Sequence, residues 1–234
     1  MPRLLLLSNS THHGQGYLDH AIEEIRDFLG GVARVTFVPF ALQDRAGYAE
    51  KFRARLGAAG FEADALAGDA ADRRRIDAAE AVFVGGGNTF RLLAALHDYG
   101  LVAPLRERAL AGMPYLGASA GINVAAPTLC TTNDMPIVEP PSFAALGLVP
   151  FQINPHYIDA DPASTHMGET REQRILEFLE ENDRVVVGLR EGAWIRVEGG
   201  SARLGGLNGA RLFRRGAAAE ERPVGARLDD LLSA

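Results

Sequence analysis

The chain has 234 residues, of which 47% are hydrophobic and 23% are charged, a balance typical of a globular protein with an apolar core. Its net charge of -6 excludes the basic surface that binding to a nucleic-acid backbone requires. Cys130 is the only cysteine, which excludes an intramolecular disulfide and a cysteine-built zinc site. No apolar stretch approaches the roughly 20 residues that span a bilayer, and residues 8–13 end the first apolar run too early for a signal peptide. We therefore expect a cytoplasmic protein without nucleic-acid or membrane partners, and a homo-oligomer is left open.

Short apolar runs alternate with amphipathic segments through most of the chain, a pattern typical of strands that feed crossover helices. One helical face carries Ile22, Ile25, Phe28 and Leu29, and similar spacing predicts helices over 90–96 and 105–110. The strands are nearly continuously apolar, as expected when helices cover both faces of a parallel sheet. They are predicted at residues 4–7, 35–40, 81–84, 115–118 and 185–189.

The pattern of apolar and polar residues changes from about Ala193 onward. Short apolar segments at 194–197, 202–204 and 210–214 are separated by pairs of glycines. This spacing predicts a β meander that closes one edge of the sheet. Residues 216–222 have no strong core face and are expected to be loosely ordered.

A G-x-S-x-G motif, Gly117 to Gly121, follows the predicted strand 115–118 and precedes a helical segment over 122–126. This context is typical of a nucleophile elbow, where small neighbours allow a strained turn that projects the serine hydroxyl. A tight turn with an N-capping serine is the plainer alternative. The strand and helix around the motif favour Ser119 as the nucleophile.

A serine nucleophile requires a histidine base and a group that orients it. His156 follows an apolar strand at the carboxyl end where α/β sites form, whereas His166 lies in a polar loop and could contact substrate. Glu191 lies just past the strand 185–189, and Asp134 is its rival for the third position. For either carboxylate taken alone, a solvated loop charge is the favoured interpretation.

A second glycine-rich loop, residues 85–89, follows the strand 81–84 and opens another helix. It lacks the Lys-Ser/Thr ending of a phosphate-binding P-loop and the G-x-G-x-x-G spacing of a dinucleotide site. We favour an oxyanion hole, with N–H groups of Gly86 and Gly87 joining that of Ala120. Asn88, in the same loop, is a candidate substrate ligand.

These residues occur in stretches that closely resemble peptidase E, the α-aspartyl dipeptidase family of serine peptidases. The resemblance runs from residue 4 to residue 194 and weakens after about Asn208. The matching stretches are LLLLSNST from Leu4, VGGGNTF from Val84, GASAG from Gly117, TTNDMPIV from Thr131, QINPH from Gln152, GETREQR from Gly168 and GLREGAW from Gly188.

The resemblance implies a doubly wound, mostly parallel α/β fold, similar to class I glutamine amidotransferases and flavodoxin-like, in one catalytic domain over 1–234. It implies a Ser, His, acid order along the chain and hydrolysis of dipeptides with N-terminal aspartate through an acyl-enzyme, without metal or organic cofactor. The family places its acid at the position of Asp134 or of Glu191, and we prefer Glu191 because it ends a strand. A cyanophycinase-type hydrolase of β-aspartyl linkages and a non-catalytic binding protein are the alternatives.

Recognition of an aspartyl side chain requires a cation, and residues 168–174 contain two. Thr170 and Gln173 form a capping box, which explains both structurally. Arg171 and Arg174 are opposed by the dipole of the helix that begins there, so their position suggests binding of a substrate carboxylate. A salt bridge to Glu169 or Glu172 is the alternative.

Overall fold

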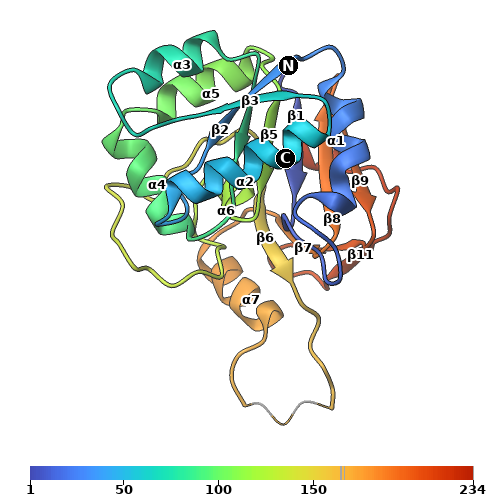
Figure 1. Ribbon diagram of the computed structural model, residues 1–234. Helices are drawn as coiled ribbons and strands as arrows, with labels where there is room; N and C mark the ends of the chain where they lie inside the picture. The colour runs from blue at the N-terminus through green and yellow to red at the C-terminus, as the bar shows by residue number, and fades with distance from the viewer. Residues whose placement is uncertain (164, 166, 234) are drawn as a thin grey trace.

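The computed structural model describes residues 1–163, 165 and 167–233, and a seven-stranded sheet lies at its centre (Figure 1). The strand order is β3-β2-β4-β5-β1-β8-β9; neighbours from β3 to β1 pair in parallel, and β8 and β9 pair antiparallel. The strands are β1 (Leu4–Leu7), β2 (Arg34–Val38), β3 (Glu62–Ala65), β4 (Ala81–Val84), β5 (Tyr115–Ala118), β8 (Ala193–Glu198) and β9 (Ser201–Gly206).

Helices cover both faces of this sheet because alternate strand residues point to opposite sides. Leu5 shares one apolar cluster with Phe28 of α1 and Phe52 of α2, whereas Leu4 belongs to the cluster on the other face with Leu93 of α4 and Leu105 of α5. The predicted doubly wound α/β fold is confirmed. The helices are α1 (Ile22–Leu29), α2 (Arg45–Ala58), α3 (Asp72–Ala78), α4 (Thr89–Asp98) and α5 (Val102–Leu110).

A second sheet has the order β11-β10-β7-β6 and lies below the first in Figure 1. Its strands are β6 (Gln152–Tyr157), β7 (Val186–Arg190), β10 (Ala210–Phe213) and β11 (Glu220–Arg222), and α7 (Arg171–Glu181) packs against it through Ile175 and Leu179. One apolar cluster contains Leu6 of the first sheet and Leu189 of the second, so the two sheets share a core.

The predicted C-terminal strands are present, but they divide between the two sheets. β8 and β9 form a hairpin that extends the first sheet beside β1, whereas β10 pairs with β7 in the second. The expectation that residues 216–222 are loosely ordered is wrong, because β11 pairs with β10. Ion pairs from Glu220 to Arg214 (3.1 Å) and from Arg222 to Asp230 (3.1 Å) hold this edge strand. Because charged side chains make these contacts, the strand has no apolar pattern by which the sequence could reveal it.

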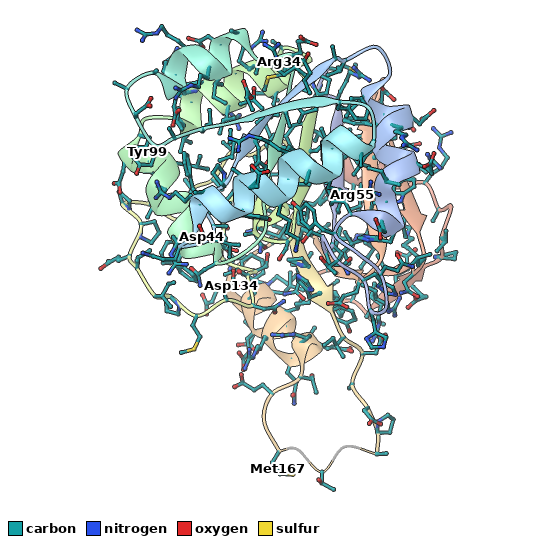
Figure 2. All side chains as sticks on the ribbon, viewed as in Figure 1. Arg34, Asp44, Arg55, Tyr99, Asp134 and Met167 are labelled. Atoms are coloured by element: carbon teal, nitrogen blue, oxygen red, sulfur yellow. The ribbon has the colours of Figure 1, made fainter. Side chains whose placement is uncertain are left out.

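Two features position the site. The carboxyl ends of β1, β4 and β5 lie side by side because these strands are parallel. The loop from β6 to α7 projects away from the sheets and carries Met167, which is 97% exposed (Figure 2).

Within the described residues, no helix has the length and apolarity needed to cross a membrane.

Candidate active site

The turn from β5 to α6 (Ala120–Asn123) holds Ser119 in an unusual conformation. Its φ of 53° lies in the left-handed region, which a residue with a Cβ adopts only under constraint. The amides of Ile122 and Asn123 donate to the Ser119 carbonyl at 2.9 and 3.2 Å, so a helix begins at the serine. A Cβ at Gly121 would lie 2.2 Å from the Val84 carbonyl oxygen, which explains the need for glycine.

Ser119, His156 and Glu191 form a continuous chain of hydrogen bonds. The distance from Ser119 Oγ to His156 Nε2 is 2.9 Å, and that from His156 Nδ1 to Glu191 Oε1 is 2.7 Å. The His156 and Glu191 side chains are 37% and 47% exposed, so substrate and water can reach them. The order matches a nucleophile, a base and an orienting acid.

A local irregularity in the second sheet aims His156 at the serine. β6 and β7 pair in parallel, and their register shifts between Pro155 and Tyr157, so His156 is an extra residue in the ladder. Its φ of 52° is again left-handed. Such a β-bulge redirects one side chain. Glu191 follows the neighbouring strand directly, which brings the acid beside the imidazole.

Ser8 and Asn9, which the sequence interpretation did not single out, tie the two sheets together at this point. The Ser8 hydroxyl accepts from the His156 amide at 2.9 Å and donates to the Leu189 carbonyl at 2.8 Å. Asn9 Oδ1 accepts from the Gly192 amide at 2.7 Å. Both residues directly follow β1 and are almost fully buried. Their position as buried polar residues at a strand end is the signal that could have identified them.

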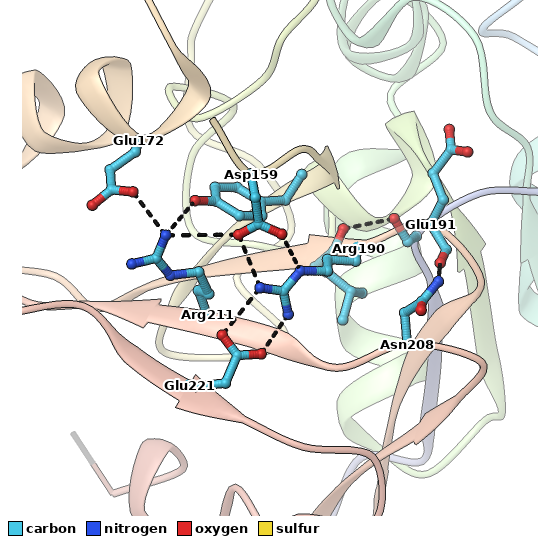
Figure 3. Close-up of polar contacts among 10 residues, drawn as sticks. Asp159, Glu172, Arg190, Glu191, Asn208, Arg211 and Glu221 are labelled. Carbon is cyan, nitrogen blue, oxygen red and sulfur yellow. Dashed lines mark hydrogen bonds and ion pairs between the residues drawn. The ribbon is translucent and has the colours of Figure 1, made fainter. Parts of the chain in front are cut away.

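A network of arginines and carboxylates supports the second sheet beside Glu191 (Figure 3). Arg190 bonds to both carboxylate oxygens of Asp159, at 2.7 and 2.9 Å, and to those of Glu221. Hydrogen bonds and charge from Arg190 hold the pKa of Asp159 below its usual value. Asn208 donates to the Glu191 carbonyl at 2.7 Å. These contacts fix the backbone on both sides of the β7 end.

The N–H groups of the glycine-rich loop differ in whether they already have a hydrogen-bond partner. Gly86 N–H donates to the buried Tyr48 hydroxyl at 2.9 Å, so this predicted oxyanion donor already has a partner. Within the described part of the chain, the N–H groups of Gly87 and Ala120 have no protein acceptor. Gly87 has φ 137°, and a Cβ there would lie 2.6 Å from the Ala41 carbonyl oxygen. Gly87 of this loop and Ala120, the first residue of α6, are therefore available as donors.

Asp134 and Asn88 meet at the start of α4 instead of at His156. Asp134 accepts from the Thr89 amide at 2.7 Å and from the Thr89 hydroxyl at 2.6 Å. Asn88 caps the same helix by accepting from the Arg91 amide at 3.0 Å, and its amide group donates to the Met135 carbonyl at 2.9 Å. A carboxylate at a helix N-terminus is favourable, so both side chains have a structural explanation.

The two predicted cations differ in their surroundings. The capping box between Thr170 and Gln173 is present, and Arg171 is the first residue of α7. Arg174 lies 3.3 Å from the Glu169 carboxylate, whereas Arg171 has no ion-pair partner among the described residues. Burial, together with the neighbouring Arg174 guanidinium, lowers the pKa of half-buried Arg171, and the Asp134 carboxylate opposes this shift. His166 lies outside the described residues.

Two cavities open near these residues. One of about 520 Å³ is lined by Ser119, His156 and the Gly86-Gly87 loop, and by one face of α2. The other, about 480 Å³, is lined by Arg171, Arg174 and residues 158–161, so it begins two residues after His156. In the ranges that the structure describes, no three His, Cys, Asp or Glu side chains are arranged to hold a metal ion.

Comparison with known proteins identifies the family. The profile of peptidase family S51 matches residues 4–205. The chain belongs to this family. It is 59% identical over 229 residues to peptidase E of Streptomyces coelicolor. The aligned region covers 98% of this chain and 94% of the relative. It is 47% identical over 221 residues to a Drosophila melanogaster protein named "Probable alpha-aspartyl dipeptidase", with 93% of this chain and 92% of the relative covered.

The fold of this S51 peptidase also occurs in a distant solved structure. The crystal structure of a peptidase from an acI-B1 Actinobacterium superposes with a TM-score of 0.73 at 15% identity, over 97% of this chain and 96% of that one. The predicted membership of the peptidase E family and the predicted enzyme class, a peptidase, are confirmed.

Proposed function

We propose that this S51 peptidase hydrolyses dipeptides with N-terminal aspartate through a Ser119, His156, Glu191 triad and an acyl-enzyme. The observation that carries the mechanism is the hydrogen-bond chain of 2.9 Å from Ser119 to His156 and 2.7 Å from His156 to Glu191. The name "Probable alpha-aspartyl dipeptidase" of the Drosophila relative supports the substrate class.

The proposed reaction has two halves. Ser119 Oγ attacks the scissile carbonyl carbon while His156 Nε2 accepts its proton, and Glu191 stabilises the resulting imidazolium through Nδ1–H. The oxyanion that forms accepts hydrogen bonds from Gly87 and Ala120. His156 then protonates the leaving amine. In the second half, water attacks the acyl-enzyme while His156 accepts a proton from it, and His156 returns this proton to Ser119 Oγ as the ester bond breaks.

Glu191 is proposed as the acid in preference to Asp134. Its carboxylate lies 2.7 Å from His156 Nδ1, and its backbone carbonyl is held by Asn208. Asp134 already accepts two hydrogen bonds from Thr89 at the start of α4. The two carboxylates therefore have separate proposed roles, one in the proton transfers and one in holding the loop beside the site.

Arg171 is proposed to bind the aspartyl side chain. It is half-buried and, among the described residues, has no carboxylate partner, so a substrate carboxylate would relieve the cost of its burial. A planar guanidinium can grip a carboxylate with two parallel hydrogen bonds, and an asparagine amide would leave donors facing each other. Arg174 already has Glu169 as a partner.

For Arg171→Met, we expect the ratio of kcat/KM for Asp-Leu over Asn-Leu to fall by about 100-fold, since breaking a buried charge pair costs roughly 3 kcal/mol. The matched control is Arg174→Met, which removes an exposed cation with a partner of its own and should change the ratio by less than about fivefold. Steady-state kinetics on both dipeptides measures this ratio. An unchanged ratio in Arg171→Met would reassign the recognition to another group.

A substrate panel tests the proposed function as a whole. The protein is assayed on Asp-Leu, β-Asp-Leu, Glu-Leu and Asn-Leu at matched concentrations. We expect Asp-Leu to be cleaved with the highest kcat/KM. Its side chain carries the carboxylate that Arg171 is proposed to bind, and the α-linkage sets the proposed distance between this carboxylate and the scissile bond. Preference for β-Asp-Leu would instead identify a hydrolase of β-aspartyl linkages, and no cleavage of any member would indicate a binding protein.

We also propose that this hydrolase acts in the cytoplasm on small peptides, without nucleic-acid or membrane partners. The exposed single cysteine, Cys130, and the net charge of -6 support this proposal. A homo-oligomer is compatible with it.

A further inference from the structure

One face of α2 lines the same cavity as the nucleophile. Asp44, Gly47, Tyr48 and Lys51 contribute to this wall, and their spacing of three and four residues puts them on one side of the helix. Ser119 and His156 line the same cavity. The wall therefore presents a cation, Lys51, to whatever occupies the space beside the serine.

Lys51 is held in place without being neutralised. Its Nζ lies 4.7 Å from the centroid of the Tyr17 ring, a cation–π contact that positions an ammonium and leaves its charge available. The next cation on this helix face, Arg55, is engaged by the Tyr17 carbonyl (3.0 Å) and by Asp19 (3.0 Å). In the described part of the chain, Lys51 forms no ion pair. Lys51 is also the only lysine of the protein.

A short run of contacts connects this ammonium with the reaction centre. The Tyr17 and Tyr48 rings meet edge to face at 6.2 Å, and the Tyr48 hydroxyl accepts from Gly86 N–H at 2.9 Å. A Cβ at Gly86 would lie 3.1 Å from Ser119 Cβ. Burial raises the pKa of both phenols, so they stay neutral. Asp44, the acid on this wall, accepts from the Gly47 amide at 2.8 Å as the cap of α2.

We propose that Lys51 binds the C-terminal carboxylate of the dipeptide, in the leaving group, and so selects substrates of two residues. The proposal rests on the proposed function above. In a dipeptide, one residue follows the scissile carbonyl and spans about 3.5 Å before its carboxylate. In a tripeptide, a neutral peptide group occupies that place, so the attraction to Lys51 is lost. In this arrangement Arg171 binds the side-chain carboxylate of the first residue, and Lys51 binds the C-terminal carboxylate of the second.

The test compares Asp-Leu with Asp-leucinamide, which differ only in the charge at the C-terminus. In Lys51→Met, kcat/KM for Asp-Leu should fall about fivefold, as for a partly exposed ion pair, and that for Asp-leucinamide should stay unchanged. Lys51→Arg keeps the charge and should keep the preference for Asp-Leu. Arg53→Met is the matched control, because it removes an exposed cation of the same helix that is paired with Glu50 at 3.4 Å.

The outcomes separate this inference from the function on which it rests. An equal loss of kcat/KM on Asp-Leu and Asp-leucinamide in Lys51→Met would overturn it, and so would the absence of any loss on either substrate. A reduced ratio of Asp-Leu over Asn-Leu with both C-terminal forms affected would assign Lys51 to the aspartyl side chain, which also contradicts it. If the unaltered protein cleaves neither Asp-Leu nor Asp-leucinamide, the proposed function itself fails.

Discussion

Replacement of Ser119 by alanine should lower kcat on Asp-Leu by a factor on the order of 10⁵ to 10⁶, the loss expected when a serine hydrolase loses its nucleophile. The change removes the oxygen that lies 2.9 Å from His156 Nε2 and leaves the oxyanion donors and both cavities in place. Steady-state kinetics measures the loss, and labelling with a fluorophosphonate should be abolished because no acyl or phosphonyl ester can form.

The control for this variant is its stability. Alanine keeps the backbone of the turn, and the lost hydrogen bond is partly exposed, so the melting temperature should stay close to that of the unaltered protein. Combining Ser119→Ala with His156→Ala should lower the rate no further, since the two side chains serve one step. Turnover by Ser119→Ala within tenfold of the parent would rule out Ser119 as the nucleophile.

Neutralising Glu191 should have the second largest effect. Glu191→Gln keeps the volume of the side chain and removes the charge that stabilises the imidazolium. We therefore expect kcat to fall on the order of 10⁴-fold, as it does when the triad aspartate of a serine protease is replaced by asparagine. The side chain is 47% exposed, so the melting temperature should hardly change. Kinetics and thermal unfolding of the same preparation separate the two quantities.

Asp134→Asn is the comparison variant, and the opposite result is expected. The carboxylate accepts from Thr89 at the start of α4, so its loss should cost about 1 kcal/mol of stability, as for a helix cap. The melting temperature should fall by about 2 to 4 °C for a chain of this size. If Asp134→Asn reduces kcat far more than Glu191→Gln does, the acid of the triad is Asp134.

The sequence predicts the core of the fold and which polar strand-end residues lie together, for one physical reason. Buried strands are continuously apolar, and in parallel sheets polar residues that end such strands gather at one edge. Ser119, His156 and Glu191 each follow or end a predicted strand, and the structure brings them into hydrogen-bond contact. The loop glycines at 85–87 could be recognised in the same way.

Features that depend on pairing between distant segments could not be predicted. β3 was missed because its sequence, EADA, has no continuous apolar run. The division into two sheets depends on which strands β7 and β10 pair with, and no local pattern encodes this. The role proposed for Lys51 could not be predicted either, because its contact with Tyr17 joins α2 to a loop 34 residues earlier in the chain.

The proposed nucleophile and its proposed base lie on different hydrogen-bonded sheets. Ser119 directly follows β5 of the first sheet, whereas His156 lies in β6 and Glu191 directly follows β7 of the second. The buried hydroxyl of Ser8 bonds to both β6 and β7 at the junction. In the proposed mechanism, activity therefore depends on how the two sheets align at this junction, and a misplacement of about 1 Å is expected to cost on the order of 100-fold in rate even if each sheet remains folded. Evolution can then tune or silence such an enzyme through residues at this junction that never contact a substrate.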